Sequence, residues 1–138
     1  MTRILVIDDD ELVREQLMGW FEREGYEVSE AADGRAGVEQ TLNQPPDLVV
    51  CDVAMPEMSG YEVLDAVRGH DHTTTLPFIF LTGQTDKAFV RHGMELGADD
   101  YLTKPFNRPE VLAAVRTRLK RRAVVADALT QELEAAKT

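Results

Sequence analysis

The sequence predicts an α/β fold: a five-stranded parallel sheet in the order 2-1-3-4-5, with five helices covering both faces. Short aliphatic runs without polar alternation recur along the chain, which is typical of strands buried on both faces of a parallel sheet. Segments with helical spacing of apolar residues lie between these runs, as right-handed βαβ units require. At 138 residues the chain has the usual size of a single domain.

The expected elements alternate regularly along the chain. We expect strands at residues 3–7, 26–31, 47–51, 78–81 and 99–102. The first helix should span about four turns and stop at Gly25, a residue suited to ending a helix. Three further helices are expected at residues 34–42, 60–68 and 86–96.

The final helix begins near Pro109 and is longer than a helix packed on such a sheet needs to be. A sheet-packing helix would end near Arg122, so residues 1–122 should form the domain. Residues 123–138 are then a helical extension or a linker to an output module. Their apolar residues continue a spacing of three and four, interrupted at Arg122, which suits a short coiled coil and a plain amphipathic linker about equally.

Charge and composition exclude several classes of protein. The formal net charge of −10 would repel a phosphate backbone, so this domain alone is not expected to bind nucleic acid. Six basic residues against one acid give residues 108–122 a local charge of +5, which we interpret as a solvated helix face. The chain shows neither a membrane span nor a secretory signal. Cys51 is the only cysteine, which fits a reducing cytoplasm.

Acidic residues follow two of the expected strands at their carboxyl ends. Asp8, Asp9 and Asp10 come directly after the first strand, and Asp52 comes directly after the third. In the order 2-1-3-4-5 these two strands are neighbours, and ligands of open parallel sheets gather beyond the carboxyl ends. Thr82 and Lys104 follow two other strands, so the same crevice should hold acids, a hydroxyl and an ammonium.

The acids are costly unless a cation joins them. Two carboxylates about 4 Å apart repel by roughly 4 kcal/mol at an effective dielectric near 20. An N-cap for the first helix explains one of the three consecutive acids, but not several. Mg²⁺ is a hard cation that is held by one or two carboxylates plus a phosphate, so the cluster predicts a Mg²⁺ site.

Four pieces of the sequence together resemble the receiver domain of bacterial response regulators. They are ILVIDD at 4–9, CDVAMPEMSG at 51–60, Thr82, and GADDYLTKPF at 97–106. The resemblance covers residues 3–122. It implies that Asp52 accepts a phosphoryl group from the phosphohistidine of a sensor histidine kinase or phosphotransfer protein. Such a domain is not an enzyme in the conventional sense, although it promotes its own phosphorylation and dephosphorylation.

The resemblance also implies roles for the residues around Asp52. Asp8 and Asp9 look like the metal-binding pair, with Asp9 a direct ligand and Asp8 acting mainly through water. Asp52 itself and the backbone carbonyl of Ala54 would complete the protein's ligands to Mg²⁺. Lys104 would pair with the incoming phosphoryl oxygens.

The switch and the tuning positions come from the same resemblance. Thr82 would follow a phosphoryl oxygen inward, and Tyr101 would rotate from solvent into the vacated space, altering the surface of the fourth helix, fifth strand and fifth helix. Periodicity alone favours an ordinary half-buried strand residue for Tyr101. The Lys104-Pro105 peptide bond is implied to be cis. Ala54 and Gln84 stand where members of the family vary and tune the lifetime of the acyl phosphate.

Two other functions remain open from the sequence. Asp8 and Asp10 form a DxD after a first strand, which resembles haloacid-dehalogenase-type phosphohydrolases, although Lys104 then follows the acids in an unsuitable order. A binding module that dimerises without phosphorylation is the second alternative. For the receiver, a phosphorylation-promoted homodimer is predicted, with cross-dimer ion pairs drawn from a small group: Arg91, Asp99, Asp100 and Arg116.

Overall fold

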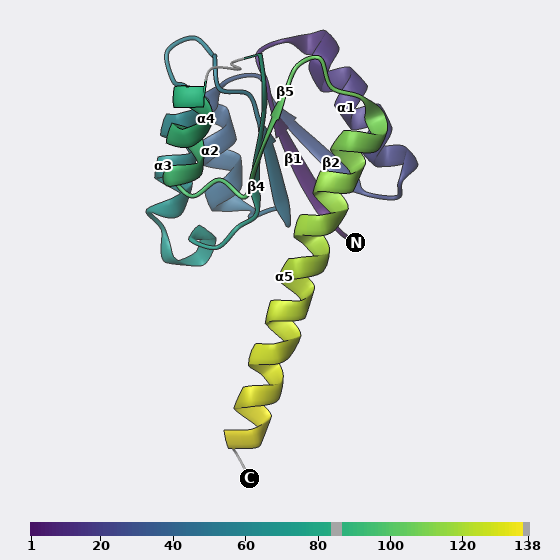
Figure 1. The fold of residues 1–138 in the computed structure, drawn as a ribbon, viewed down its shortest axis with the longest axis vertical. Coiled ribbons are helices and arrows are strands. Elements are labelled where there is room, and N and C mark those ends of the chain that lie inside the picture. The colour runs from purple at the N-terminus through teal and green to yellow at the C-terminus, as the bar shows by residue number, and fades with distance from the viewer. Residues whose placement is uncertain (84–86, 137–138) are drawn as a thin grey trace.

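The five strands form one parallel sheet in the order β2-β1-β3-β4-β5, as predicted (Figure 1). This computed structural model describes residues 1–83 and 87–136. The strands are β1 Arg3–Ile7, β2 Glu27–Ala31, β3 Leu48–Cys51, β4 Phe78–Thr82 and β5 Asp100–Thr103. Each observed boundary lies within one residue of its prediction. Buried apolar runs define β1, β3 and β4 sharply, whereas the outer strands β2 and β5 are only partly buried.

In the described part of the chain, five α-helices connect and follow the strands. They are α1 Glu11–Arg23, α2 Gly34–Asn43, α3 Gly60–Arg68, α4 Lys87–Glu95 and α5 Arg108–Ala136. The expected start of the fourth helix at Asp86 and the tuning position Gln84 lie outside the described residues. A short 3-10 helix, η1 Asp71–Thr73, was not predicted. The Thr73 hydroxyl donates to the Val67 carbonyl of α3 at 2.6 Å, a contact that no local periodicity signals.

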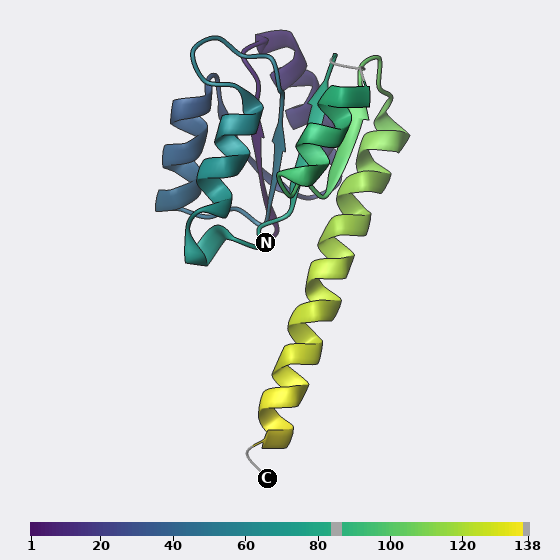
Figure 2. The same ribbon diagram turned by 60° about the vertical axis from the view of Figure 1, so that its left-hand side comes forward.

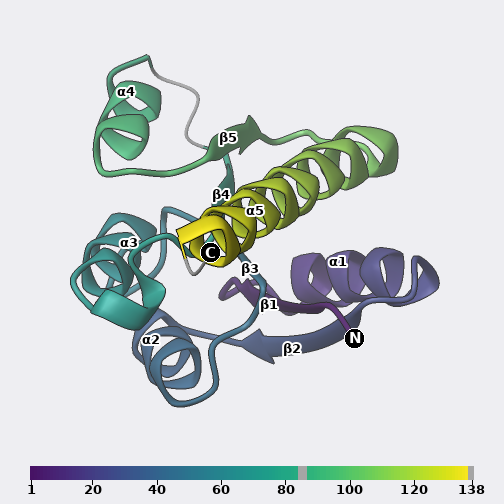
Figure 3. The same ribbon diagram turned by 90° about the horizontal axis from the view of Figure 1, so that it is seen from below.

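The helices sandwich the sheet in two layers (Figure 3). Helices α1 and α5 cover one face, and α2, α3 and α4 cover the other. Successive residues of β1 point to opposite faces: Ile4 and Val6 pack with the α1/α5 core, whereas Leu5 and Ile7 pack with the other core. Both faces of the strand are therefore buried, which explains its unbroken apolar sequence.

The register brings the chemistry-bearing residues to one edge of the sheet. Ile7 pairs with Cys51, so Asp8 and Asp52 leave their strands side by side. Thr82 pairs with Thr103 at the carboxyl ends of β4 and β5, directly before Lys104. The fold thus gathers at one place residues that are far apart in the chain.

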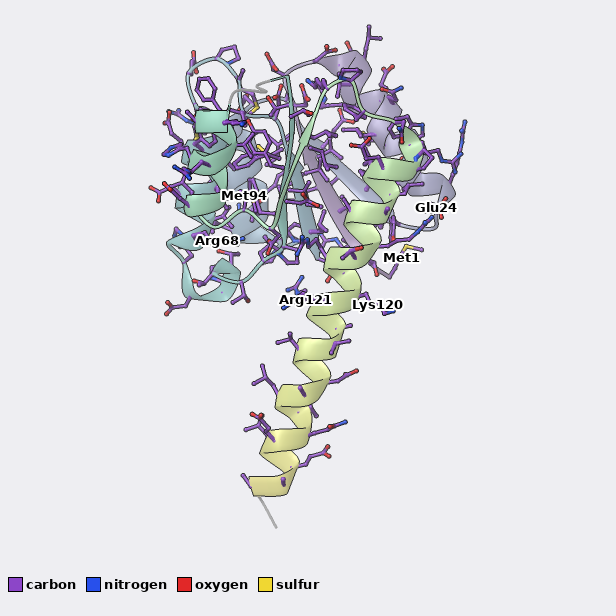
Figure 4. The ribbon with its side chains drawn as sticks, in the orientation of Figure 1. Met1, Glu24, Arg68, Met94, Lys120 and Arg121 are labelled. Atoms are coloured by element: carbon purple, nitrogen blue, oxygen red, sulfur yellow. The ribbon has the colours of Figure 1, made fainter. Side chains whose placement is uncertain are left out.

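Helix α5 runs past the sheet and projects from the globule (Figure 2). It continues unbroken through Arg122, and every described residue from Lys120 onward is exposed. Lys120 and Arg121 lie where it leaves the body of the molecule (Figure 4). Several large apolar side chains of the projecting part are exposed: Val124, Val125, Leu129 and Leu133. Among residues 1–83 and 87–136, no helix has the length and apolar character needed to span a bilayer.

Candidate functional site

Three carboxylates meet at the carboxyl ends of β1 and β3. Asp8, Asp9 and Asp52 each offer an oxygen within 4.8 Å of the others. Asp8 and Asp52 are buried, at 2% and 6% exposure, while Asp9 is exposed. The expectation that acids from two separate strand ends converge is met by this geometry.

Backbone donors fix the two buried carboxylates. The N–H of Asp10 donates to Asp8 Oδ1 at 2.9 Å, and the N–H of Val53 donates to Asp52 Oδ1 at 2.7 Å. The N–H of Asp52 continues the ladder onto the Ile7 carbonyl at 2.9 Å. One oxygen of each buried acid thus accepts a hydrogen bond from the backbone, and the other lies near Lys104 Nζ.

Lys104 brings the positive charge from the end of β5. Its Nζ lies 3.5 Å from Asp52 Oδ2 and 3.7 Å from Asp8 Oδ2. The Lys104 N–H donates to the Thr82 carbonyl at 2.7 Å, which ties the end of β5 to the end of β4. The Lys104-Pro105 peptide bond is cis. One ammonium therefore spans both buried carboxylates.

The surroundings of Asp8 oppose its ionisation. Burial raises the pKa of Asp8 most, and the hydrogen bond from the Asp10 N–H lowers it. The negative charges of Asp52 and Asp9 raise the pKa further, and the positive charge of Lys104 lowers it in part. Together these effects raise the pKa of Asp8 from 3.8 to about 6. The carboxylates of Asp8, Asp9 and Asp52 fit a divalent cation, because their negative charges repel one another at this distance and a bound cation would offset that repulsion.

Asp10 caps a helix, unlike Asp8 and Asp9. Its side chain accepts from the N–H groups of Leu12 and Val13, at 2.9 and 3.4 Å, as the N-cap of α1. It is not part of the carboxylate cluster of Asp8, Asp9 and Asp52. The geometry therefore separates the Asp8–Asp10 pair that the phosphohydrolase alternative needs.

The remaining predicted residues surround this cluster. Thr82 is fully buried at the end of β4. Tyr101 is partly buried, with its ring 5.7 Å from that of Phe80, so it is not in open solvent in this structure. Ala54 is exposed two residues after Asp52.

Three of the four residues predicted to pair across a dimer are engaged within the chain. Arg68 contacts Asp99 at 3.3 Å, and Arg118 lies 4.0 Å from Asp100. Arg116 contacts Glu24 at 3.0 Å, where the end of α1 meets α5 (Figure 4). A dimer with ion pairs across its interface would first have to break these internal ion pairs.

Sequence reasoning missed Arg14. Its guanidinium donates to the Asp8 carbonyl at 2.7 Å, and its Nε lies 3.6 Å from a Glu30 oxygen. No local spacing signals these contacts, because Glu30 lies on β2 and the other acceptor is a backbone carbonyl at the end of β1.

The receiver-domain family of response regulators matches this chain across residues 4–116. RpaA of a Synechocystis species, a DNA-binding dual master transcriptional regulator, is 38% identical over 121 residues, or 88% of this chain and 50% of that protein. PhoP of Bacillus subtilis, an alkaline phosphatase synthesis transcriptional regulatory protein, is 39% identical over 124 residues, or 90% and 51%. The chain thus spans about half the length of the curated relatives it matches.

Solved structures share the whole fold. A putative response regulator from Chloroflexus aurantiacus superposes with a TM-score of 0.82 at 39% identity, covering 86% of this chain and 98% of that one. The receiver domain of the sensor histidine kinase PA1611 from Pseudomonas aeruginosa, solved with a magnesium ion coordinated in its active-site cleft, gives 0.80 at 25% identity, with 86% and 98% covered. Sequence and fold agree, and they give the phosphohydrolase alternative no support. The chain belongs to the response regulator receiver domain family of two-component signal transduction.

Proposed function

We propose that this receiver domain accepts a phosphoryl group on Asp52 and thereby acts as a signalling switch. The observation that carries the proposal is the placement of Lys104 Nζ, 3.5 Å from Asp52 Oδ2 and 3.7 Å from Asp8 Oδ2, in a cluster that Asp9 completes. A nucleophilic carboxylate beside a fixed cation is what phosphoryl transfer by positioning and charge neutralisation requires.

The two oxygens of Asp52 would have separate tasks. Oδ1 is held by the Val53 N–H, so Oδ2, next to Lys104, is the oxygen that attacks phosphorus. The P–N bond to the donor's histidine breaks, and its electron pair returns to the imidazole nitrogen, which takes up a proton from solvent. The product is an acyl phosphate on Asp52, with Lys104 paired to the phosphoryl oxygens.

The acids supply the residues for a divalent cation. Asp8, Asp9, Asp52 and the backbone carbonyl of Ala54 would hold Mg²⁺, with Asp9 a direct ligand and Asp8 acting mainly through water. When bound, Mg²⁺ would neutralise the carboxylates and the charge developing on the phosphoryl oxygens. Asp8 and Lys104 would then keep Asp52 oriented toward the donor.

The readout would involve Thr82 and Tyr101. A phosphoryl group adds up to two negative charges and three acceptor oxygens, which the Thr82 hydroxyl can follow. Thr82 and Tyr101 lie on neighbouring strands next to α4, so their movement would alter the face made by α4, β5 and α5. The donor would be a sensor histidine kinase or phosphotransfer protein, and an output module would read the altered face.

The test is covalent labelling of the full chain with acetyl phosphate and Mg²⁺, followed by intact-mass analysis. The wild type should gain one phosphoryl group, Asp52→Asn should gain none, and Asp10→Asn should label like the wild type because asparagine also caps a helix. Labelling of Asp52→Asn combined with loss of labelling in Asp8→Asn would favour the phosphohydrolase alternative and overturn the proposal.

Phosphorylation-promoted homodimerisation is a second part of the proposal. A dimer through the α4–β5–α5 face would exchange the internal pairs Arg68–Asp99 and Arg118–Asp100 for pairs across the interface. Sedimentation with and without beryllofluoride measures the mass directly. A mass that stays monomeric with beryllofluoride would refute the homodimer, whereas a dimer mass already present without beryllofluoride would indicate a module that dimerises without phosphorylation.

A further inference from the structure

Tyr61 stands at the start of α3, directly after the loop that follows Asp52. The preceding Gly60 donates its N–H to the Val53 carbonyl at 2.8 Å. A Cβ atom at Gly60 would overlap the carbonyl of Asp52 and come within 3.0 Å of Val53 Cα. The first turn of α3 is therefore packed against the backbone of the proposed phosphoacceptor, and any displacement of that backbone acts on Tyr61.

The side chain of Tyr61 reaches from α3 to two other elements. Its hydroxyl donates to the Phe89 carbonyl of α4 at 2.9 Å, across 28 residues of sequence. Its ring packs edge-on against Phe80 of β4, with centroids 5.4 Å apart, and against His92 of α4 at 4.7 Å. One side chain thus joins α3, β4 and α4.

Tyr101 is the next member of this aromatic cluster. Its ring lies against Phe80, and a Cβ added to Gly93 of α4 would come within 3.1 Å of it. Burial raises the pKa of Tyr101 above its ordinary value, and the neighbouring Tyr61 side chain adds to this effect. Tyr61 and Tyr101 both pack against the ring of Phe80, so the three rings form one cluster beside α4.

We propose that Tyr61 is a positioning residue of the switch: its hydroxyl ties α3 to the backbone of α4, and its ring lies with that of Tyr101 against Phe80. Through it, a displacement of the Asp52 loop is transmitted to the α4–β5 face. The trigger rests on the proposed phosphorylation of Asp52, whereas the Tyr61 linkage is a property of the unmodified chain. The two parts can therefore fail separately.

The variant Tyr61→Phe removes one oxygen and keeps the ring contacts with Phe80 and His92. Amide hydrogen exchange in α4 should accelerate on the order of three- to tenfold in the unmodified protein, as expected for one lost hydrogen bond. In protein labelled with 3-fluorotyrosine, the Tyr101 resonance, assigned with Tyr101→Phe, should shift. The matched control is Tyr26→Phe, since Tyr26 packs against Phe21 in the opposite core and should leave both readouts unchanged.

A double variant tests the linkage itself. If Tyr61 and Tyr101 act through their common contact with Phe80, Tyr61→Phe and Tyr101→Leu should have effects on α4 exchange that do not add. Additive effects, or an unshifted Tyr101 resonance with unchanged α4 exchange, would overturn the proposal.

Beryllofluoride then tests transmission. Wild-type protein should show changed exchange in α4 and β5 on adding it, and Tyr61→Phe should show a smaller change while acquiring phosphoryl from acetyl phosphate within about twofold of the wild-type rate. An equal response in both proteins refutes transmission through Tyr61. A wild type that takes up no phosphoryl refutes the proposed function instead, and the exchange and resonance data still decide the linkage.

Discussion

Replacing Asp8 by asparagine should stabilise the protein when no divalent cation is present. Asparagine keeps the Oδ1 acceptor for the Asp10 N–H and removes a buried negative charge from the cluster. A pKa raised from 3.8 to about 6 means that ionised Asp8 costs about 3 kcal/mol of folding free energy well above that pKa. The amide would face Lys104 less favourably than the carboxylate does, at a cost of about 1 kcal/mol, so the expected net gain is about 2 kcal/mol.

The sign of the pH dependence follows from proton binding. Between about pH 4 and pH 6 the folded protein holds a proton on Asp8 that the unfolded chain has released, so wild-type stability falls as pH rises through this window. Asparagine does not titrate. The stability advantage of Asp8→Asn should therefore be larger at about pH 7.5 than at about pH 5, by roughly 1.4 kcal/mol.

Urea unfolding in EDTA at the two pH values measures both quantities. Asp10→Asn is the matched control: it makes the same chemical change two residues away, on an exposed N-cap, and should alter stability by less than about 0.5 kcal/mol. Adding Mg²⁺ should stabilise the wild type more than Asp8→Asn. If Asp8→Asn is less stable than the wild type in EDTA, or its advantage does not depend on pH, the electrostatic account of Asp8 is wrong.

Three other substitutions test the packing and backbone around the site, each by urea unfolding. Gly60→Ala would force a Cβ into the Asp52 carbonyl and should cost about 2 kcal/mol or more, whereas Gly19→Ala meets no atom within 4 Å and should be neutral or stabilising by up to about 1 kcal/mol. Arg68→Met leaves the carbonyls of Leu76 and Gly97 without their guanidinium donor and should cost about 2–3 kcal/mol; a smaller loss would mean that water replaces it. Glu57 has a φ of +66°, so Glu57→Val should lose about 1–2 kcal/mol while Glu57→Gly should not, and equal losses would contradict backbone strain as the cause.

The sequence was sufficient for most of the fold because the three central strands β1, β3 and β4 are buried on both faces. The runs at β1 and β3 contain no polar residue after Arg3, so their ends show where apolar character gives way to Asp8 and Asp52. Gly25, with a φ of +89°, ends α1 as its conformational freedom suggested. The 3-10 helix η1 could not be predicted, because the hydrogen bond from the Thr73 hydroxyl to the Val67 carbonyl leaves no periodic pattern in the sequence.

The site was predictable to the extent that strand ends define it. Convergence of Asp8, Asp52 and Lys104 follows from parallel strands alone, since their carboxyl ends share one edge. Tyr61 was not predictable, because its partner Phe89 lies on another helix and its spacing is that of any half-buried helix residue. The internal partners of Asp99 and Asp100, Arg68 and Arg118, were likewise not predicted, because each lies on another element.

The electrostatic imbalance of the site explains why it should respond to modification. Among the described residues, the three carboxylates of this cluster face one ammonium, that of Lys104, which leaves a formal excess of negative charge, and the raised pKa of Asp8 reflects the cost of that excess. The fold tolerates that cost because β1 and β3 are anchored in two well-packed cores. A site with uncompensated negative charge is stabilised more by each added cation or hydrogen-bond donor than a site with balanced charge is. The Asp52 loop is therefore the segment whose position should depend most on what binds there, and Gly60 and Tyr61 connect it directly to α4.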